Sequence, residues 1–584
     1  MLLPAGTLLL VLILLLRIVI LCPGNEKLAQ QLSPVPVIDT DDDFWLPIVG
    51  EYTMPITFHG SPLVQRFFDN GLMQCYGFAE KQAQHMTKGA LQLLNKDSAS
   101  NMACPMCYWL LAMSHAPFLN HPWLSGESLN AAHEAADLAK QGAKMTNLSL
   151  TIKEKCLIDA ISLRFPYGSP ANQTKGYEAY RDRLKALCTS MPDDMDISAF
   201  YADSILILHC DTNGYHFYES DNITPLPEVR EAIQVLEHCL EISEMVTVSE
   251  AVHPLCAHLY VHVTEPSYRP ERANATADKL AAGWKETQAQ HLQHMPSHTY
   301  LRVGRYHDAI VTNSKAHESD EMWLEQGRLP YGPAHDTAFL IHAAGLSGER
   351  EVAYSYADRL RDHYRKYPDR PDGPGPELGW HIWRTIRLRF GDWGAVISDS
   401  DDLPTGYDWP YAVLMGEFSK GVAFLGRGGP AGVDNAQSSL KNLRQILPTV
   451  DPGYRQLAQI ANLTLSSGIA FANGEPETAL QLIREARIEQ ERWDYTEPPD
   501  WFMTEAACEG ILLHLMGRNE EAIHIFEHDL QEIPANRFSL YGLLLSATSA
   551  GRSTEIISII EARYVAASAW SDDNPPTICP QLGQ

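Results

Sequence analysis

The sequence GRYHDA, at residues 304–309, contains a short motif that recurs through the second half of the chain. The motif is a glycine followed five residues later by alanine, and it returns at 348–353 (GEREVA), 474–479 (GEPETA) and 517–522 (GRNEEA), with a variant at 391–396 (GDWGAV). Successive glycines lie 43 or 44 residues apart, and the one longer gap, of 83 residues, contains the glycine-rich sequence GRGGPAGVDNA where a further copy is expected. Glycine allows the chain to turn after one helix, and the small alanine allows the next helix to pack closely.

This repeat predicts the fold class. From residue 61 onward, apolar residues recur every three or four positions, which is the period of an amphipathic helix, and alternating strand patterns are scarce. We therefore expect an all-α, right-handed α-solenoid of tetratricopeptide-like helix-turn-helix repeats, with helices or turns longer than in the 34-residue repeat. The expected parts of the chain are a leader (1–24), an extended lead-in (25–60), two helical-repeat regions (61–300 and 301–563) and a tail (564–584).

Several stretches resemble a family of large tetratricopeptide-like (TPR) repeat proteins that is common in bacteria. CPMCYW at 104–109, a C-x-M-C-x-W motif, and HMPSH at 294–298 carry the resemblance, together with 67–78, 258–273, 495–502 and 538–552. The similarity spans most of residues 60–552. It implies a helical-repeat fold, and it does not imply a particular reaction.

The N-terminus predicts entry into the secretory pathway. Residues 2–22 are almost entirely apolar, and Cys22-Pro23-Gly24 places small residues where a signal peptidase would cleave. We favour a cleaved signal peptide, the alternative being an N-terminal anchor that would be the only contact with a membrane, and we expect an extracellular or luminal protein. The glycosylation sequons are at Asn147, Asn172, Asn222, Asn274 and Asn462.

Charge and motifs exclude several function classes. The chain has 45 Lys and Arg residues against 73 Asp and Glu residues, a net charge of −28, so a nucleic-acid partner is not expected. No P-loop, no dinucleotide-binding glycine motif and no G-x-S-x-G sequence is present, so neither a nucleotide cofactor nor serine-hydrolase chemistry is supported.

Histidines gather at helical spacing between residues 252 and 342. His258 and His262 are four residues apart, as are His294 and His298, while Glu265 follows His262 by three, and His335 follows in the next segment. Residues at i and i+4 share one face of a helix, so two such helices can bring imidazoles to one point. Imidazole ligands suit copper, zinc or iron. The pattern predicts a transition-metal site with His258, His262, His294 and His298 as ligands. His335 and Glu265 are candidates either for further ligands or for groups that orient a ligand imidazole. Packed or surface histidines would produce the same sequence pattern.

A second soft-metal candidate is Cys104-Pro-Met-Cys107, with His115 and methionines nearby. Thiolate, thioether and imidazole together would suit copper(I), but in an oxidising compartment the two cysteines can equally form a disulfide. The other cysteine pairings cannot be read from the sequence.

Two classes of function remain open. The first is a luminal or extracellular metalloprotein, with a metalloenzyme as one form of this class and with no catalytic residue assigned. The second is a non-catalytic scaffold whose concave groove binds a protein, a peptide or a glycan, or which self-associates.

Overall fold

The computed structural model describes residues 45–97, 104–145, 147–165, 173–246, 252–284, 287–370, 375–400, 402–572, 576–577 and 579–582. Across these residues the chain forms helices joined by short turns, and its β-structure is limited to two isolated bridges, Phe118 with His121 and Tyr218 with Pro225. The all-α solenoid of tetratricopeptide-like hairpins is therefore confirmed. Among the described residues, no helix combines the length and the hydropathy that a membrane span requires. The leader (1–24) and Asn172 lie outside the described residues.

The contacts divide the chain into two compact units. Unit 1 comprises residues 1–296 and 318–331, and unit 2 comprises residues 297–317 and 332–584. Helix α14 (Tyr306–Glu325) is continuous and contributes residues to both units.

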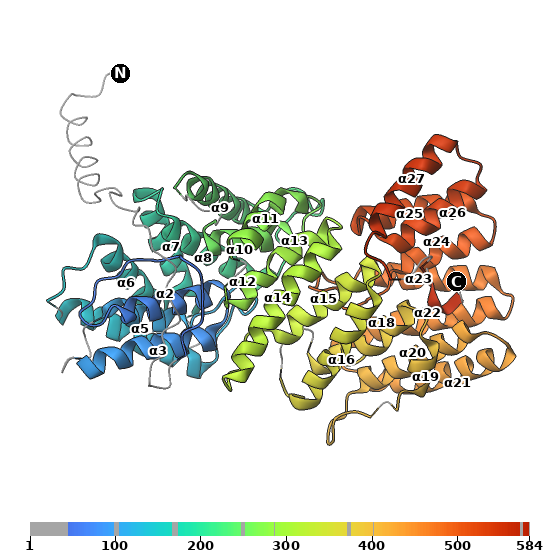
Figure 1. Cartoon of the computed structure of the whole chain (residues 1–584), viewed down its shortest axis with the longest axis horizontal. Coiled ribbons are helices and arrows are strands. Elements are labelled where there is room, and N and C mark those ends of the chain that lie inside the picture. Colours follow the sequence, from blue (N-terminus) through green and yellow to red (C-terminus); the bar gives the residue numbers. More distant parts are fainter. Residues whose placement is uncertain are drawn as a thin grey trace. The chain divides into compact units, whose positions relative to one another are not determined.

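Unit 1 is an array of helix hairpins, drawn from blue to green in Figure 1. Each helix packs against the next along the chain. One large apolar cluster runs through most of the array, and a second, smaller cluster joins α2 to α3. Two of the helices begin at residues that favour a helix N-terminus. Thr151 and Glu154 form a reciprocal capping box at α6, and Pro254 occupies the first turn of α10. The helices of unit 1 are α2 (Leu63–Tyr76), α3 (Glu80–Asp97), α4 (Pro105–Met113), α5 (Gly126–Met145), α6 (Ile152–Arg164), α7 (Gln173–Ser190), α8 (Met195–Asn213), α9 (Pro227–Val246), α10 (Pro254–Thr264), η2 (Pro270–Ala273), α11 (Asn274–Gly283) and α12 (Gln290–His294).

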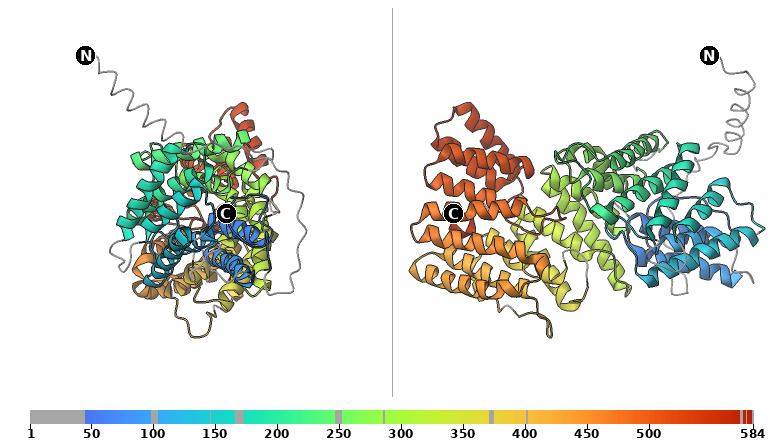
Figure 2. Two further views of the ribbon diagram at one scale, coloured as in Figure 1. Left: turned by 90° about the vertical axis from the view of Figure 1, so that its left-hand side faces the viewer. Right: turned by 180° about the vertical axis from the view of Figure 1, so that it is seen from behind.

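Unit 2 repeats the same hairpin, and its later members, α20 to α27, are stacked side by side (Figure 2). Its helices are α13 (Pro296–Arg302), α15 (Pro333–Ser347), α16 (Arg350–Lys366), α17 (Pro376–Gly379), α18 (Ile382–Arg389), α19 (Trp393–Ser398), α20 (Pro410–Arg427), α21 (Pro430–Ile446), η3 (Leu447–Thr449), η4 (Pro452–Tyr454), α22 (Arg455–Ala472), α23 (Pro476–Glu491), α24 (Glu505–Leu515), α25 (Asn519–Glu532), α26 (Arg537–Ser549), α27 (Thr554–Ala567) and η5 (Pro580–Leu582).

The glycine-alanine motif marks the hairpin turns of unit 2. Each motif glycine follows the end of a helix and has a positive φ, between 71° and 86°, which only glycine adopts at low cost (Gly304, Gly348, Gly391, Gly474 and Gly517). The residue five positions later is fully buried in the next helix (Ala309, Ala353, Val396, Ala479 and Ala522). The gap in the repeat is filled by the α20–α21 hairpin, whose turn is Gly428-Gly429, as the spacing predicts.

Candidate metal centre

The first two imidazoles of the candidate centre come from α10. The helix begins with His253 as its N-cap, whose Nδ1 accepts the N–H of Cys256 at 3.2 Å, and Pro254 follows in the first turn. All residues from Pro254 to Thr264 are buried. The helical period then places His258 and His262 on one face, with ring centroids 4.9 Å apart, as their spacing predicts.

The third imidazole is His291, on the short helix α12. Its ring centroid lies 5.1 Å from that of His258 and 6.3 Å from that of His262. One ligand nitrogen from each of the three residues lies within 4.8 Å of the others, and all three side chains are buried. The sequence pattern did not single out His291, because it has no histidine partner four residues away.

A backbone carbonyl orients His258. Nδ1 of His258 lies 2.5 Å from the carbonyl oxygen of Tyr76, the last residue of α2, where a helix leaves its carbonyls without intrahelical partners. A carbonyl can only accept, so Nδ1 carries the proton and Nε2 carries the lone pair. A hydrogen bond of this kind fixes the tautomer and ring orientation of metal-ligating histidines.

Aromatic rings enclose the three imidazoles. The ring of Phe78 lies 4.2 Å from His258, 5.9 Å from His262 and 5.8 Å from His291, measured between centroids. Tyr331 approaches His291 edge-on at 5.0 Å. Phe78 has a φ of 57°, an uncommon value for a bulky residue. Such strain persists where the surrounding structure holds it, and it is frequent at functional sites.

The other predicted ligands are placed as follows. His294 ends α12 in unit 1, with its ring stacked 5.2 Å from that of His291, and Glu265 is the buried C-cap of α10. Pro296 separates α12 from α13, so His294 and His298 do not share a helix. His298 and His335 belong to unit 2, where their rings are 5.8 Å apart.

Within unit 2, His298 also has a carboxylate partner that the sequence pattern did not indicate. Its Nδ1 lies 3.2 Å from Oε2 of Glu497. The predicted six-residue set is thus distributed over two units, and each unit holds its own histidine group.

The cysteines of the second candidate form a disulfide. The sulfurs of Cys104 and Cys107 are 2.10 Å apart, so neither is available as a thiolate ligand, and of the two alternatives the structure favours the disulfide. His115 instead contacts Gln84, with its Nδ1 3.2 Å from the amide nitrogen. Two further disulfides join Cys239 to Cys256 and Cys508 to Cys579.

Comparison with known proteins gives similarity of structure only. No protein-family model matches the chain, and no curated protein sequence matches it. Among solved structures, the human IFIT1 dimer with m7Gppp-AAAA is 11% identical with a TM-score of 0.26, over 84% of this chain and 86% of that one. The APC/C hetero-tetramer Cut9–Hcn1 is 11% identical with a TM-score of 0.23, over 89% of this chain and 96% of that one. Scores this low carry no argument about the ligands of this chain.

Proposed function

We propose that this chain is a metal-binding helical-repeat protein and that His258, His262 and His291 are its ligands. The observation that carries the proposal is the convergence of three buried imidazoles from two helices of unit 1. Tetrahedral zinc holds its nitrogen ligands about 3.4 Å apart. The three ligand nitrogens here lie within 4.8 Å of one another, so the imidazoles would move closer together around a bound ion. Copper, zinc and iron all suit this ligand set.

A site with three protein ligands leaves a coordination position for water or substrate. Catalytic zinc sites have this composition, whereas structural zinc sites use four protein ligands. A bound metal would supply Lewis acidity there and lower the pKa of a coordinated water. The chain's own contribution is to hold His258 through the Tyr76 carbonyl and to exclude solvent with Phe78. These features support a metalloenzyme.

An extracellular or luminal location accords with this proposal. Three disulfides persist in oxidising compartments and are rare in the cytosol. Asn147 is exposed and can accept a glycan, as the sequons predict. The apolar leader would direct the chain there.

Elemental analysis of the full chain, purified from a secreting host, tests the metal. We expect roughly one transition-metal ion per chain, retained after dialysis, and its loss in a His258→Ala/His291→Ala double variant with unchanged helical circular dichroism. The matched control is His238→Ala/His524→Ala, which removes two solvent-exposed histidines. A His298→Ala/His335→Ala variant shows whether the unit 2 histidines bind a second ion.

The proposal fails if the wild-type chain holds no metal after loading with zinc, copper and iron in turn, or if the control loses as much metal as the double variant. A non-catalytic scaffold that binds a protein, a peptide or a glycan, or that self-associates, would then be the better description.

A further inference from the structure

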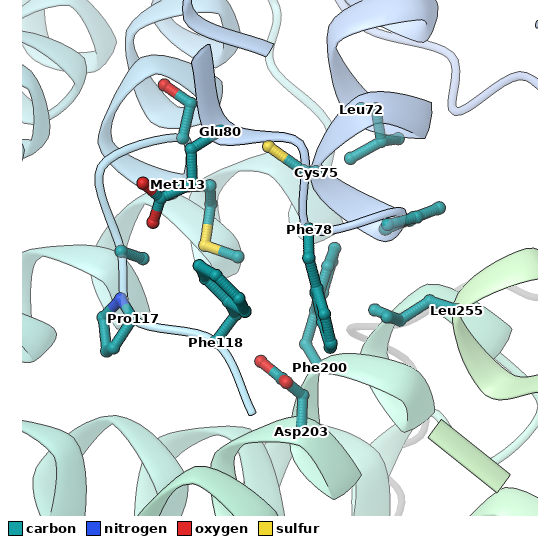
Figure 3. A pocket seen from close by; sticks show the side chains of 13 residues that line it. Leu72, Cys75, Phe78, Glu80, Met113, Pro117, Phe118, Phe200, Asp203 and Leu255 are labelled. Atoms are coloured by element: carbon teal, nitrogen blue, oxygen red, sulfur yellow. The ribbon is translucent and has the colours of Figure 1, made fainter. Parts of the chain in front are cut away.

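A pocket in unit 1 shares one wall with the three imidazoles. It is bounded by the end of α2, the start of α3, the loop after α4, and α8 (Figure 3). Phe78, which contacts the rings of His258, His262 and His291, also lines this pocket. The pocket is nevertheless distinct from the candidate metal centre, because none of the three imidazoles lines it.

Aromatic rings form much of the pocket wall. Phe78, Phe118 and Phe200 all line it, and the rings of Phe78 and Phe118 lie 4.8 Å apart. Met113 adds a thioether to the same wall. The electron-rich faces of aromatic rings attract cations, and the attraction is strongest where water is excluded.

The charged groups that line the pocket are carboxyls. Asp203 points from α8 toward the rings of Phe118 and Phe78, and Glu80 lies at the opposite end of the pocket, beside Met113 (Figure 3). Asp203 is only 7% exposed. The Arg164 guanidinium attracts its carboxylate, but the effect of that attraction on the Asp203 pKa is smaller than the effect of burial. Oε1 of Glu80 is buried without a hydrogen-bond partner. For both carboxyls the cost of burial exceeds the attraction of the nearby cations Arg164 and Lys81, so both groups would gain from a positively charged ligand.

The possible donors in the wall are engaged elsewhere. The hydroxyl of Tyr76 donates to Asp196 at 2.6 Å, and that of Ser114 donates to the Leu111 carbonyl at 2.8 Å. Burial raises the pKa of the Cys75 thiol far above its usual range, so the thiol remains neutral. Arg164 lies behind the wall, donating to the Pro117 carbonyl at 3.1 Å and contacting the Met113 sulfur. The pocket thus offers acceptors and aromatic faces, and it lacks a lining cation for an anionic ligand.

We propose that this pocket binds a small organic cation, an ammonium group attached to a compact apolar body. The ammonium group would pair with Asp203 and lie against Phe78 and Phe118, and Glu80 would supply a second acceptor. Burial raises the pKa of Asp203 and of Glu80 to about 7, and a bound cation would lower both by favouring the carboxylate form. The binding would not require a metal, because the pocket contains none of the three imidazoles.

Calorimetric titration of the full chain at pH 8 tests the proposal with three probes of one shape: benzylammonium, benzyl alcohol and benzoate. We expect saturable binding of benzylammonium alone. Asp203→Asn should weaken this binding at least about tenfold, and Phe78→Leu about fivefold. Asp211→Asn, which changes a carboxyl on the same helix outside the pocket, should leave it unchanged.

Equal binding of benzyl alcohol, preference for benzoate, absence of benzylammonium binding, or full affinity in Asp203→Asn would each overturn the proposal. The titration is repeated on chelator-treated protein and on the His258→Ala/His291→Ala variant. Retained binding there supports the cation site even if the metal proposal fails, and lost binding shows that the site depends on the imidazoles and contradicts the inference.

Discussion

Glu505 is a fully buried carboxyl at the start of α24, and it provides a test at the scale of one residue. Its Oε1 accepts the indole N–H of Trp501 at 2.9 Å, and burial raises its pKa from 4.5 to about 7. A carboxyl whose pKa is raised by folding costs nothing below its unfolded pKa, where it is protonated in both states. The cost grows between pH 4.5 and pH 7 and is complete above pH 7.

Replacing Glu505 by glutamine removes this cost and keeps an oxygen for Trp501. We expect Glu505→Gln to raise the free energy of unfolding by up to about 3 kcal/mol at pH 8 and to change it little at pH 4. Urea unfolding at the two pH values measures the difference. Glu477→Gln, at a position with a largely exposed side chain, is the control and should show no such pH dependence. Equal effects at pH 4 and pH 8 would show that Glu505 is not the titrating group.

At the scale of the element, the turn between α24 and α25 shows what the repeat glycines contribute. Gly517 has a φ of 75°, and a β-carbon added there would meet no atom within 4 Å. A substitution at this position therefore measures backbone strain without steric overlap.

We expect Gly517→Ala to destabilise the protein by about 1 kcal/mol, and Gly517→Asn to cost less, because asparagine tolerates the left-handed region better than alanine. Chemical denaturation of both variants provides the comparison. If Gly517→Ala left the free energy of unfolding unchanged, the turn would be able to adopt a negative φ. The glycine at this position of the repeat would then need another explanation.

At the scale of the whole molecule, the division into two units predicts two separable unfolding transitions. The Cys508–Cys579 disulfide closes a loop of about 70 residues and links the tail of the chain to α24 in unit 2. The tail also packs through η5 against α20 and α22. Removing such a crosslink typically costs about 2–4 kcal/mol. In calorimetry, Cys508→Ser/Cys579→Ser should lower the transition temperature of unit 2 and leave that of unit 1 unchanged.

Adding zinc to the wild-type protein should raise the transition temperature of unit 1, because the three imidazoles belong to that unit. Ligand at a hundredfold excess over its Kd stabilises the folded state by about 2.7 kcal/mol. A single transition that responds to both changes would show that the two units unfold together.

The repeat architecture and part of the candidate site follow from the amino-acid sequence alone. The 43-residue period, the turn glycines and the buried residue five positions after each follow from local rules, since glycine alone adopts a positive φ cheaply. The pairing of His258 with His262 is also local, because the helical period spans only four residues.

Which groups meet from distant parts of the chain depends on how the helices pack. His291 lies beside His258 and His262 because α12 and α10 pack within one unit. Asp203 on α8 and Glu80 on α3 line the same pocket. The choice of disulfide at Cys104 and Cys107, and the distribution of the remaining histidines over two units, are likewise tertiary. Packing between helices depends on the shapes of many side chains at once, so no short-range period of the sequence predicts these contacts.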